Sequence, residues 1–215
     1  MEKKEISRAV ISRLPRYYRY LGDLLAEGTE RISSKELSQK MHVTASQIRQ
    51  DLNNFGGFGQ QGYGYNVETL YNEIGNIIGL DRKYNLIIIG AGNLGRALSG
   101  YSDFERRGFI VKQIFDIDPE KIGLIINGVE VLSSADLGDY IKKEKVDIAA
   151  LTLPKEAAVP MAANLVKWGI EAIWNFAPVD LRLSSDTIVE NIHLSDTLMR
   201  LSYELKEKRN ARRKR

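Results

Sequence analysis

Three glycines spaced as G-x-G-x-x-G follow an apolar run, and this arrangement favours dinucleotide binding. The apolar run covers residues 86–89, and Gly90, Gly92 and Gly95 lead from it into a helical pattern. In such a motif the first glycine permits a tight turn, the second lets the backbone approach a pyrophosphate, and the third allows a helix to pack closely on a strand. The N–H groups that begin the helix would donate hydrogen bonds to the pyrophosphate. The alternative is a tight strand-to-helix turn without a ligand.

A carboxylate stands where this motif needs a ribose-binding group. The next strand-like run, residues 109–115, ends at Asp116, which follows Gly95 by 21 residues. A carboxylate at this point accepts hydrogen bonds from the ribose 2′-hydroxyl and repels a 2′-phosphate. No phosphate clamp directly follows Asp116, so the pattern favours NAD(H) over NADP(H). Residues 118–121 are also typical of a turn that starts a helix with proline at its first position, and the two interpretations are compatible.

The segments around these residues alternate between strands and helices. The expected strands and helices cover residues 86–89, 94–101, 110–115, 135–143, 146–152, 156–167 and 172–174. Such alternation predicts an α/β fold in which helices cover both faces of a doubly wound parallel sheet, the Rossmann architecture. We expect this nucleotide-binding domain to span residues 81–192.

Residues 1–80 have a different pattern, which predicts a winged helix-turn-helix domain. A helix is expected from Pro15 to Gly28. Residues 33–36 and 44–47 both match the capping box, so two further helices should begin there, joined by about three residues. A glycine-rich segment, residues 56–65, is typical of a β-hairpin whose tip approaches a phosphate backbone. This outline is that of helix-turn-helix DNA-binding proteins.

Polar side chains on the second of these paired helices favour contacts with bases. Arginine can donate two hydrogen bonds to guanine, and glutamine can pair with adenine. The basic N-terminal segment would add phosphate contacts. The alternative is a solvated polar face of a small helical domain. The residues expected to contact DNA are Arg13, Thr44, Ser46, Gln47, Arg49, Gln50 and Tyr63.

Composition excludes several other kinds of site. The 215 residues, 43% hydrophobic and 27% charged, include no run of the ~18–20 apolar residues that a membrane span needs, so we expect a cytoplasmic protein. The absence of cysteine excludes disulfides, thiolate catalysis and cysteine–zinc sites. The two histidines are His42, expected in a turn, and His193, so we expect no metal site and no catalytic residue.

The charge of the C-terminal segment dominates the net charge of the chain. The chain carries +3 overall, but residues 206–215 contain seven basic residues and one acid, so the remainder is negative. Bulk charge is therefore no argument for nucleic-acid binding. Residues 193–208 place four leucines at helical spacing and predict an amphipathic helix, followed by a basic tail, residues 209–215, typical of a solvated end. The pattern does not distinguish a helix packed on its own subunit from one exchanged between subunits.

Five motifs together resemble the Rex family of redox-sensing transcriptional repressors. They occupy residues 44–52, 62–65, 90–95, 115–121 and 175–178, and the similarity covers residues 6–205. The resemblance implies a homodimeric bacterial repressor whose winged helices bind inverted-repeat operator DNA and whose Rossmann domain binds NADH or NAD⁺. It further implies that the last helix is exchanged between subunits. NADH would close the dimer and release the operator, whereas NAD⁺ would permit DNA binding.

The resemblance also assigns residues to the cofactor and to a switch. Tyr101 matches a tyrosine beside the nicotinamide, and Arg19 matches an arginine that reaches toward the partner subunit. Arg49 and Gln50 match operator-contacting positions. The implied cofactor contacts are Gly90, Ala91, Gly92, Asn93, Leu94, Gly95, Tyr101, Asp116, Ile117, Thr152, Leu153, Pro154, Asn175 and Phe176.

The sequence departs from the family pattern in two places. His193 stands where the family has an acidic residue that communicates with Arg19 and Tyr101, and Asp196 lies one turn further on. Gln50 stands where the family pattern has a lysine.

Two alternative functions remain open from the residues. The first is an NAD-dependent dehydrogenase with an N-terminal appendage, although few residues follow the fourth strand and His193 is the sole imidazole there. The second is a regulator for another adenylate-containing ligand, because Asp116 would contact only a ribose. A chain that combines a DNA reader with a dinucleotide pocket and has no cysteine can report redox state through the NADH/NAD⁺ ratio, and we therefore prefer the repressor.

Overall fold

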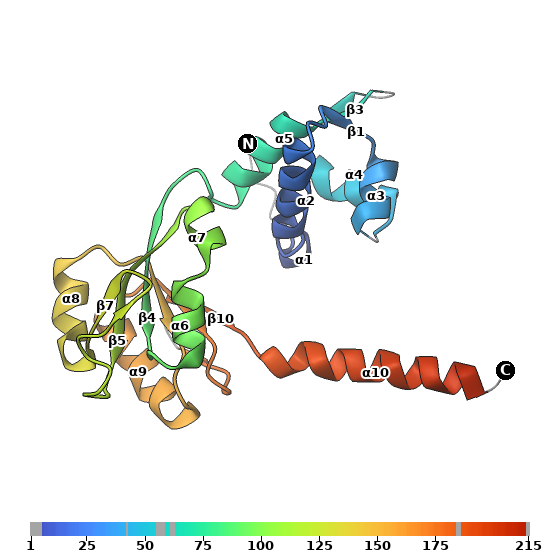
Figure 1. Ribbon diagram of the computed structural model, residues 1–215. Helices are drawn as coiled ribbons and strands as arrows, with labels where there is room; N and C mark the ends of the chain where they lie inside the picture. The colour runs from blue at the N-terminus through green and yellow to red at the C-terminus, as the bar shows by residue number, and fades with distance from the viewer. Residues whose placement is uncertain (1–5, 42, 55–58, 61–62, 184–185, 214–215) are drawn as a thin grey trace. The chain divides into compact units, whose positions relative to one another are not determined.

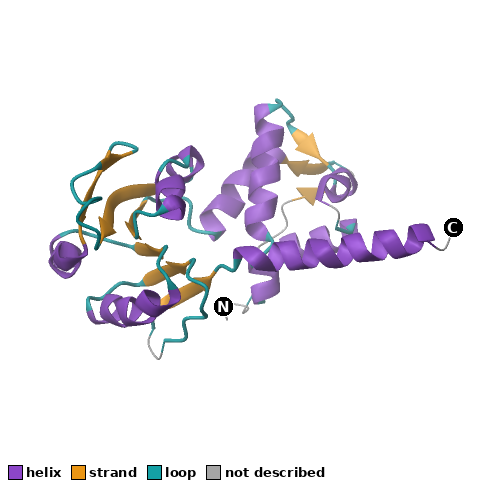
Figure 2. Ribbon diagram, turned by 60° about the horizontal axis from the view of Figure 1, so that its bottom comes forward, coloured by secondary structure: helices purple, strands orange, loops and turns teal. Residues whose placement is uncertain are grey.

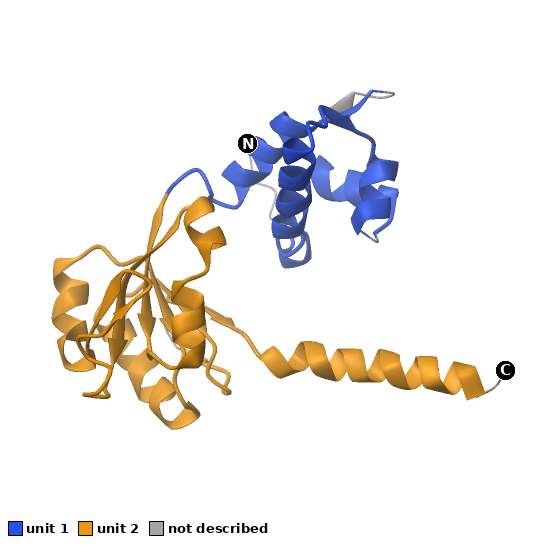
Figure 3. Ribbon diagram, viewed as in Figure 1, with its two compact units in different colours: residues 1–82 blue, residues 83–215 orange. Residues whose placement is uncertain are grey.

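The computed structural model describes residues 6–41, 43–54, 59–60, 63–183 and 186–213. The chain divides into two compact units, Met1–Arg82 and Lys83–Arg215 (Figure 3). His42, expected in a turn, lies outside the described residues, as do residues 55–58 and 61–62 of the glycine-rich segment.

The first unit is a winged helix-turn-helix, as predicted (Figure 1). Its sheet has the order β1-β3-β2, and both strand pairs are antiparallel. The β2–β3 hairpin is the wing, and α3 and α4 are the paired helices. The elements are α1 (Arg8–Ile11), α2 (Leu14–Ala26), β1 (Arg31–Ile32), α3 (Ser34–Met41), α4 (Ala45–Asn53), β2 (Gly59–Gln60), β3 (Gly64–Asn66) and α5 (Val67–Ile77).

One apolar core holds the first unit together. Tyr17 and Leu21 of α2 are fully buried, as are Ile48 of α4 and Ile74 of α5. Helix α2 therefore supports the helix that was expected to read DNA. Burial of each of the three aliphatic side chains contributes roughly 1.5–3 kcal/mol.

Only one of the two predicted capping boxes is complete. The Ser33 N–H donates to Glu36 Oε2 at 2.8 Å, and the Glu36 N–H donates to Ser33 Oγ at 3.1 Å. At the second, the Gln47 N–H donates to Thr44 Oγ1 at 3.1 Å, but the Gln47 amide group donates to Asp51 Oδ1 at 2.8 Å. The Gln47 side chain, which would have completed the second capping box, thus binds the buried Asp51 carboxylate instead.

The second unit contains the predicted Rossmann sheet (Figure 2). The order is β10-β9-β8-β4-β5-β7-β6, and all pairs are parallel except the β6–β7 hairpin. The chain runs outward from β4 in one direction and from β8 in the other, so the two strands flank the switch point where such sheets bind ligands. The strands are β4 (Tyr84–Ile89), β5 (Phe109–Asp116), β6 (Ile125–Ile126), β7 (Val129–Ser133), β8 (Ile148–Leu151), β9 (Ala172–Asn175) and β10 (Ile188–Asn191).

Helices cover both faces of this sheet. Ile87 and Ile89 of β4 belong to a core cluster that contains Leu137 and Leu165, whereas Ile88 belongs to a second cluster on the opposite face. This alternation follows from the two-residue period of a strand. The helices are α6 (Asn93–Ser99), α7 (Ser102–Arg106), α8 (Leu137–Lys143), α9 (Lys155–Lys167) and α10 (Leu194–Arg213), with a 3₁₀ turn at Ser134–Asp136.

The structure corrects several details of the expected elements. The helix expected over residues 94–101 ends at Ser99, and a second helix that was not predicted, α7, begins at Ser102 after Gly100 and Tyr101. Residues 118–121 form a turn, in which the Lys121 N–H donates to the Asp118 carbonyl at 3.0 Å, and no helix begins there. Strands β6, β7 and β10 were not predicted.

Helix α10 extends beyond the expected amphipathic segment. It continues to Arg213, so the predicted basic tail is helical over its described part. No described residue of α10 is buried, and Leu194, Leu198 and Leu201 are more than half exposed. Among the described residues, no helix is long and apolar enough to cross a membrane.

Candidate functional site

The three motif glycines meet different surroundings at the end of β4. Gly90 has a φ of +108°, and a Cβ there would lie 2.7 Å from the Thr152 carbonyl oxygen. A Cβ at Gly95 would lie 1.9 Å from the Gly90 carbonyl oxygen, so only glycine lets α6 pack this closely. A Cβ at Gly92 would meet no heavy atom within 4 Å. The tight turn therefore explains Gly90, and the close packing of α6 explains Gly95. Gly92 is not required by either, and it leaves open space above the backbone.

Asp116 is a buried carboxylate that joins the glycine turn to the end of β5. Its Oδ2 accepts from the Ala91 N–H at 2.6 Å, and its Oδ1 accepts from the Asp118 N–H at 2.9 Å. The Lys121 ammonium lies 3.4 Å from Oδ2. Burial alone would raise the pKa of Asp116, but these donors outweigh it and the pKa is lowered. Asp116 is therefore an anion, with acceptor capacity left for one more donor among its roughly four lone-pair sites.

A cleft of about 600 Å³ lies at the carboxyl ends of β4, β5 and β8. Its lining includes all the predicted cofactor residues at the end of β5 and in the loop after β8, but only Gly90 and Gly92 of the glycine turn. The other predicted residues of that turn are outside the lining: Ala91, Asn93, Leu94 and Gly95. The sequence prediction missed Lys121 and Ser134 in this lining, together with Ala157 and Met161 of α9. The lining residues are Ile89, Gly90, Gly92, Asp116, Ile117, Asp118, Lys121, Ser134, Thr152, Leu153, Pro154, Ala157 and Met161.

Tyr101 lies outside the lining of this cleft. It is 55% exposed at the break between α6 and α7, and its ring contacts Phe104 edge-on with the centroids 4.8 Å apart. Phe104 contacts Trp174, which contacts Phe176. Tyr101, Phe104 and Trp174 help to line a separate apolar cavity of about 390 Å³.

The Asn175 side chain hydrogen-bonds to the loop that follows it and to the end of β10. Its Nδ2 donates to the Val179 carbonyl at 2.7 Å and to Asn191 Oδ1 at 2.9 Å. Its Oδ1 accepts from the Ala177 N–H at 3.0 Å. These bonds join the ends of β9 and β10, so the side chain supports the sheet edge in this structure.

The exposed face of α4 carries the predicted base-reading residues. Ser46, Arg49, Gln50, Asn53 and Asn54 line one polar depression of the surface. Arg49 is exposed, and its Nη1 donates to Ser34 Oγ of α3 at 3.0 Å. This bond links the two paired helices.

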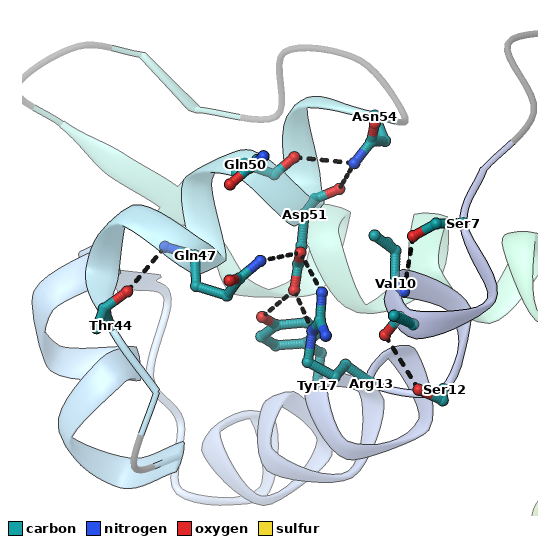
Figure 4. Close-up of polar contacts among 11 residues, drawn as sticks. Ser7, Val10, Ser12, Arg13, Tyr17, Thr44, Gln47, Gln50, Asp51 and Asn54 are labelled. Atoms are coloured by element: carbon teal, nitrogen blue, oxygen red, sulfur yellow. Dashed lines mark hydrogen bonds and ion pairs between the residues drawn. The ribbon is translucent and has the colours of Figure 1, made fainter.

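Arg13 and Gln47, also expected to contact DNA, are bonded to the fully buried Asp51 (Figure 4). The Arg13 Nε and Nη2 donate to the two Asp51 oxygens at 2.7 Å each, and the Tyr17 hydroxyl donates at 2.8 Å. Burial would raise the pKa of Asp51, but the bonds from Arg13, Gln47 and Tyr17 outweigh it and the pKa is lowered. The cluster fixes α4 against α2. The sequence prediction missed Asp51 itself.

Comparison with known proteins gives matches over both units. Residues 5–53 match a family described as putative DNA-binding protein N-terminus, and residues 81–179 match the CoA binding domain family. The redox-sensing transcriptional repressor Rex of Thermoanaerobacter pseudethanolicus (strain ATCC 33223 / 39E) is 59% identical, over 96% of this chain and 92% of that protein. Rex of Clostridioides difficile (strain 630) is 57% identical, over 95% of this chain and 97% of that protein. The chain belongs to the Rex family.

Solved structures of a Rex-family repressor, RSP, agree with this fold. RSP is 55% identical, with a TM-score of 0.90 over 98% of both chains. A complex of RSP with β-NAD⁺ and operator DNA gives 57% identity and a TM-score of 0.90, over 98% of this chain and 97% of that chain. A complex with β-NADH gives 54% and 0.89, over 98% and 99%. The predicted Rex membership and fold are confirmed, and the relatives are repressors instead of dehydrogenases.

That Arg19, Tyr101 and His193 form the expected Rex switch remains a prediction. His193 Nε2 lies 2.8 Å from Asp180 Oδ1, so the histidine has a carboxylate partner within the second unit. Arg19 belongs to the first unit, where its guanidinium carbon lies 5.7 Å from the centroid of the Tyr20 ring. Tyr101 lies beside Phe104, as described above.

Asp180 is expected to keep His193 protonated to a higher pH than an ordinary histidine. The hydrogen bond that protonated His193 donates to Asp180 raises the pKa of His193, and the charge of Asp196 adds to this. The pair therefore stabilises the fold where His193 is protonated and Asp180 is ionised, and this contribution disappears as the pH rises through the folded-state pKa of His193. A pH titration of the His193 ring by NMR should show a midpoint above about 6.5. Asp180→Asn should lower it, and Asp196→Asn should lower it less; an unchanged midpoint in Asp180→Asn would contradict the assignment.

Proposed function

We propose that this Rex-family chain represses transcription by binding operator DNA through its first unit and leaves the operator when NADH binds its second unit. The observation that carries this proposal is the presence, in one chain, of a polar helix-turn-helix face and of a Rossmann cleft that ends at an ionised, buried Asp116. The relative RSP is described in complex with NAD⁺ and operator DNA, and separately with NADH. These complexes support both halves of the proposal.

The cleft fits a nicotinamide dinucleotide. The open space above Gly92 admits a pyrophosphate close to the backbone, and Asp116 has acceptor capacity for a ribose hydroxyl. The bound cofactor would supply the redox signal through its nicotinamide. The residues that would hold it are those of the glycine turn (Gly90, Ala91, Gly92, Asn93, Leu94 and Gly95), Asp116 and Ile117 after β5, Thr152, Leu153 and Pro154 after β8, and Tyr101, Asn175 and Phe176.

The first unit would read DNA with residues from three places. Ser46, Arg49 and Gln50 on the open face of α4 would contact base edges, because this face carries donors and acceptors and is exposed. Thr44 and Tyr63 would contact the sugar–phosphate backbone. Arg13 and Gln47 would act by holding α4 in place through Asp51.

Two chains would bind one operator. A symmetric homodimer presents two recognition helices, and a helix-turn-helix dimer reads half-sites about one helical turn, or a multiple of it, apart. An inverted-repeat operator matches that symmetry. NADH can release the dimer only through its differential affinity for the two dimer arrangements, about 5.5 kcal/mol for a near-complete switch. Arg19, Tyr101 and His193 would couple the nicotinamide to that change.

The test is a fluorescence-anisotropy titration of this protein on the operator duplex used for the RSP complex. NADH is expected to release the DNA, whereas NAD⁺ is expected to leave it bound. Coenzyme A, named by the family that matches residues 81–179, and NADPH serve as competitors and should have little effect. Unchanged operator occupancy at NADH concentrations shown to saturate the protein would overturn the proposal.

Arg49→Ala is expected to lower operator affinity by about 5- to 150-fold, because one bidentate base contact is worth about 1–3 kcal/mol. The matched control is Lys40→Ala on α3, whose ammonium pairs with Glu27 at 3.6 Å on an exposed surface. The control should change operator affinity by less than about threefold. Equal losses in both variants would show that Arg49 contributes only positive charge.

A further inference from the structure

One ammonium group lies between two carboxylates at the ribose end of the cleft. The Lys121 Nζ lies 3.4 Å from Asp116 Oδ2 and 3.3 Å from Asp118 Oδ2. All three residues line the cleft, and the Lys121 side chain is 30% exposed. The position next to the ribose-binding carboxylate therefore carries two negative charges and one positive charge.

These charges act in opposite directions on the two kinds of dinucleotide. A ribose 2′-hydroxyl needs only an acceptor, which Asp116 provides. A 2′-phosphate carries a charge of about −1.5 to −2, so the carboxylates repel it and the ammonium attracts it. A cation at this place should therefore have little effect on the affinity for NADH and a large effect on the affinity for NADPH.

We propose that Lys121 is a specificity-determining residue of the cleft. Asp116 and Asp118 lower the affinity for 2′-phosphorylated dinucleotides by repulsion, and Lys121 offsets part of that loss of affinity. This inference rests on the proposed binding of NADH. Hydrogen bonds to both carboxylates raise the pKa of Lys121, so the ammonium stays charged at neutral pH. Lys121 thus limits how strongly the wild-type cleft prefers NADH.

A purely structural role would have a different signature. Asp116 is held independently of Lys121, because the Ala91 and Asp118 N–H groups donate to its two oxygens at 2.6 and 2.9 Å. Loss of Lys121 therefore leaves the ribose-binding carboxylate in place. If Lys121 served only to hold Asp116, its loss would weaken NADH and NADPH equally.

The experiment measures the affinities of the full-length protein for NADH and NADPH by calorimetry, with competition titrations where binding is weak. In Lys121→Ala, NADPH affinity should fall about tenfold, as expected for loss of one charge-assisted contact. NADH affinity should fall less than about threefold, so the preference for NADH widens. Lys121→Gln should give the same result, and Lys121→Arg should retain the wild-type ratio.

A second comparison isolates the pairing with Asp116. Asp116→Asn should raise the affinity for NADPH and so narrow the preference for NADH over NADPH. The double variant Asp116→Asn/Lys121→Ala should lose this gain of NADPH affinity. The control is Lys142→Ala, which removes an ammonium 3.3 Å from Asp139 in the same i,i+3 arrangement but away from the cleft lining. It should leave both affinities unchanged. Thermal unfolding without ligand shows whether each variant retains its fold.

The outcomes separate this inference from the function on which it rests. If wild-type protein binds neither NADH nor NADPH, the proposed function fails and the inference fails with it. If wild-type protein binds NADH but Lys121→Ala changes both affinities equally, or narrows their ratio, the function stands and the role of Lys121 is overturned.

Discussion

Replacing Arg13 with methionine is expected to lower the free energy of unfolding of the first unit by about 3–5 kcal/mol. Methionine keeps much of the side-chain volume but removes both donors that bind Asp51 at 2.7 Å. Asp51 is fully buried, and removing one partner of a buried ion pair leaves an uncompensated charge, which costs about this much. Tyr17 and Gln47 would remain as neutral donors and offset only part of the loss. Because Asp51 lies on α4, operator binding should fall with stability.

Hydrogen–deuterium exchange localises this effect. Peptides from residues 14–54 should exchange faster in Arg13→Met, whereas peptides from residues 84–116 of the second unit serve as an internal reference. Arg8→Met, which removes an exposed arginine of α1, is the matched control and should leave both regions unchanged. Adding Asp51→Asn to Arg13→Met should recover part of the lost protection, since it removes the buried charge. Equal protection in the wild type and Arg13→Met would contradict a structural role for the pair.

Alanine at Gly95 and at Gly92 is expected to have different consequences. In Gly95→Ala the new methyl group would lie 1.9 Å from the Gly90 carbonyl oxygen, so α6 must move away from β4. Such overpacking costs about 1–3 kcal/mol, and the displaced turn should lose NADH binding. In Gly92→Ala the methyl group meets open space at an ordinary φ of −77°, so stability should change by no more than about 1 kcal/mol. The methyl group would nevertheless occupy the approach to the pyrophosphate, and NADH affinity should fall about 10- to 100-fold.

Unfolding and binding are measured on the same samples. Trp168 and Trp174 both lie in the second unit, so denaturant unfolding followed by tryptophan fluorescence reports on it directly. NADH affinity comes from calorimetry. Full NADH affinity in Gly92→Ala would show that the backbone there is not approached by the dinucleotide.

Local sequence signals were sufficient for the glycine turn and for both fold classes. The glycines act within a few residues of one another, and Asp116 ends the neighbouring strand, so spacing alone relates them. The sequence also contains a local signal for the hairpin of β6 and β7. Asn127 and Gly128 both have positive φ, which is the Asn-Gly pattern of a tight hairpin, and they connect the unpredicted β6 and β7.

The Asp51 cluster depends on tertiary contacts. Arg13 and Asp51 are 38 residues apart, and no spacing rule relates them. The one available signal was that Asp51 shares the inward face of α4 with Ile48 and Leu52, where a carboxylate needs a buried partner. The same distance effect explains why Arg13 is assigned to DNA by type and position alone, although the structure bonds it to Asp51. Gln47 lies only four residues before Asp51 on α4, so its bond to Asp51 follows an ordinary i,i+4 spacing that the sequence already shows.

Helix α10 has a consequence for how this segment acquires its structure. Nucleating an isolated helix is unfavourable, and most helices in proteins owe their stability to an apolar side packed against other residues. The 20 residues of α10 have no such support among the described residues of their own chain, because none of them is buried. The coil-to-helix transition of this segment should therefore be coupled to the event that covers Leu194, Leu198 and Leu201. Circular dichroism across a dilution series would then show helical content falling as the protein is diluted.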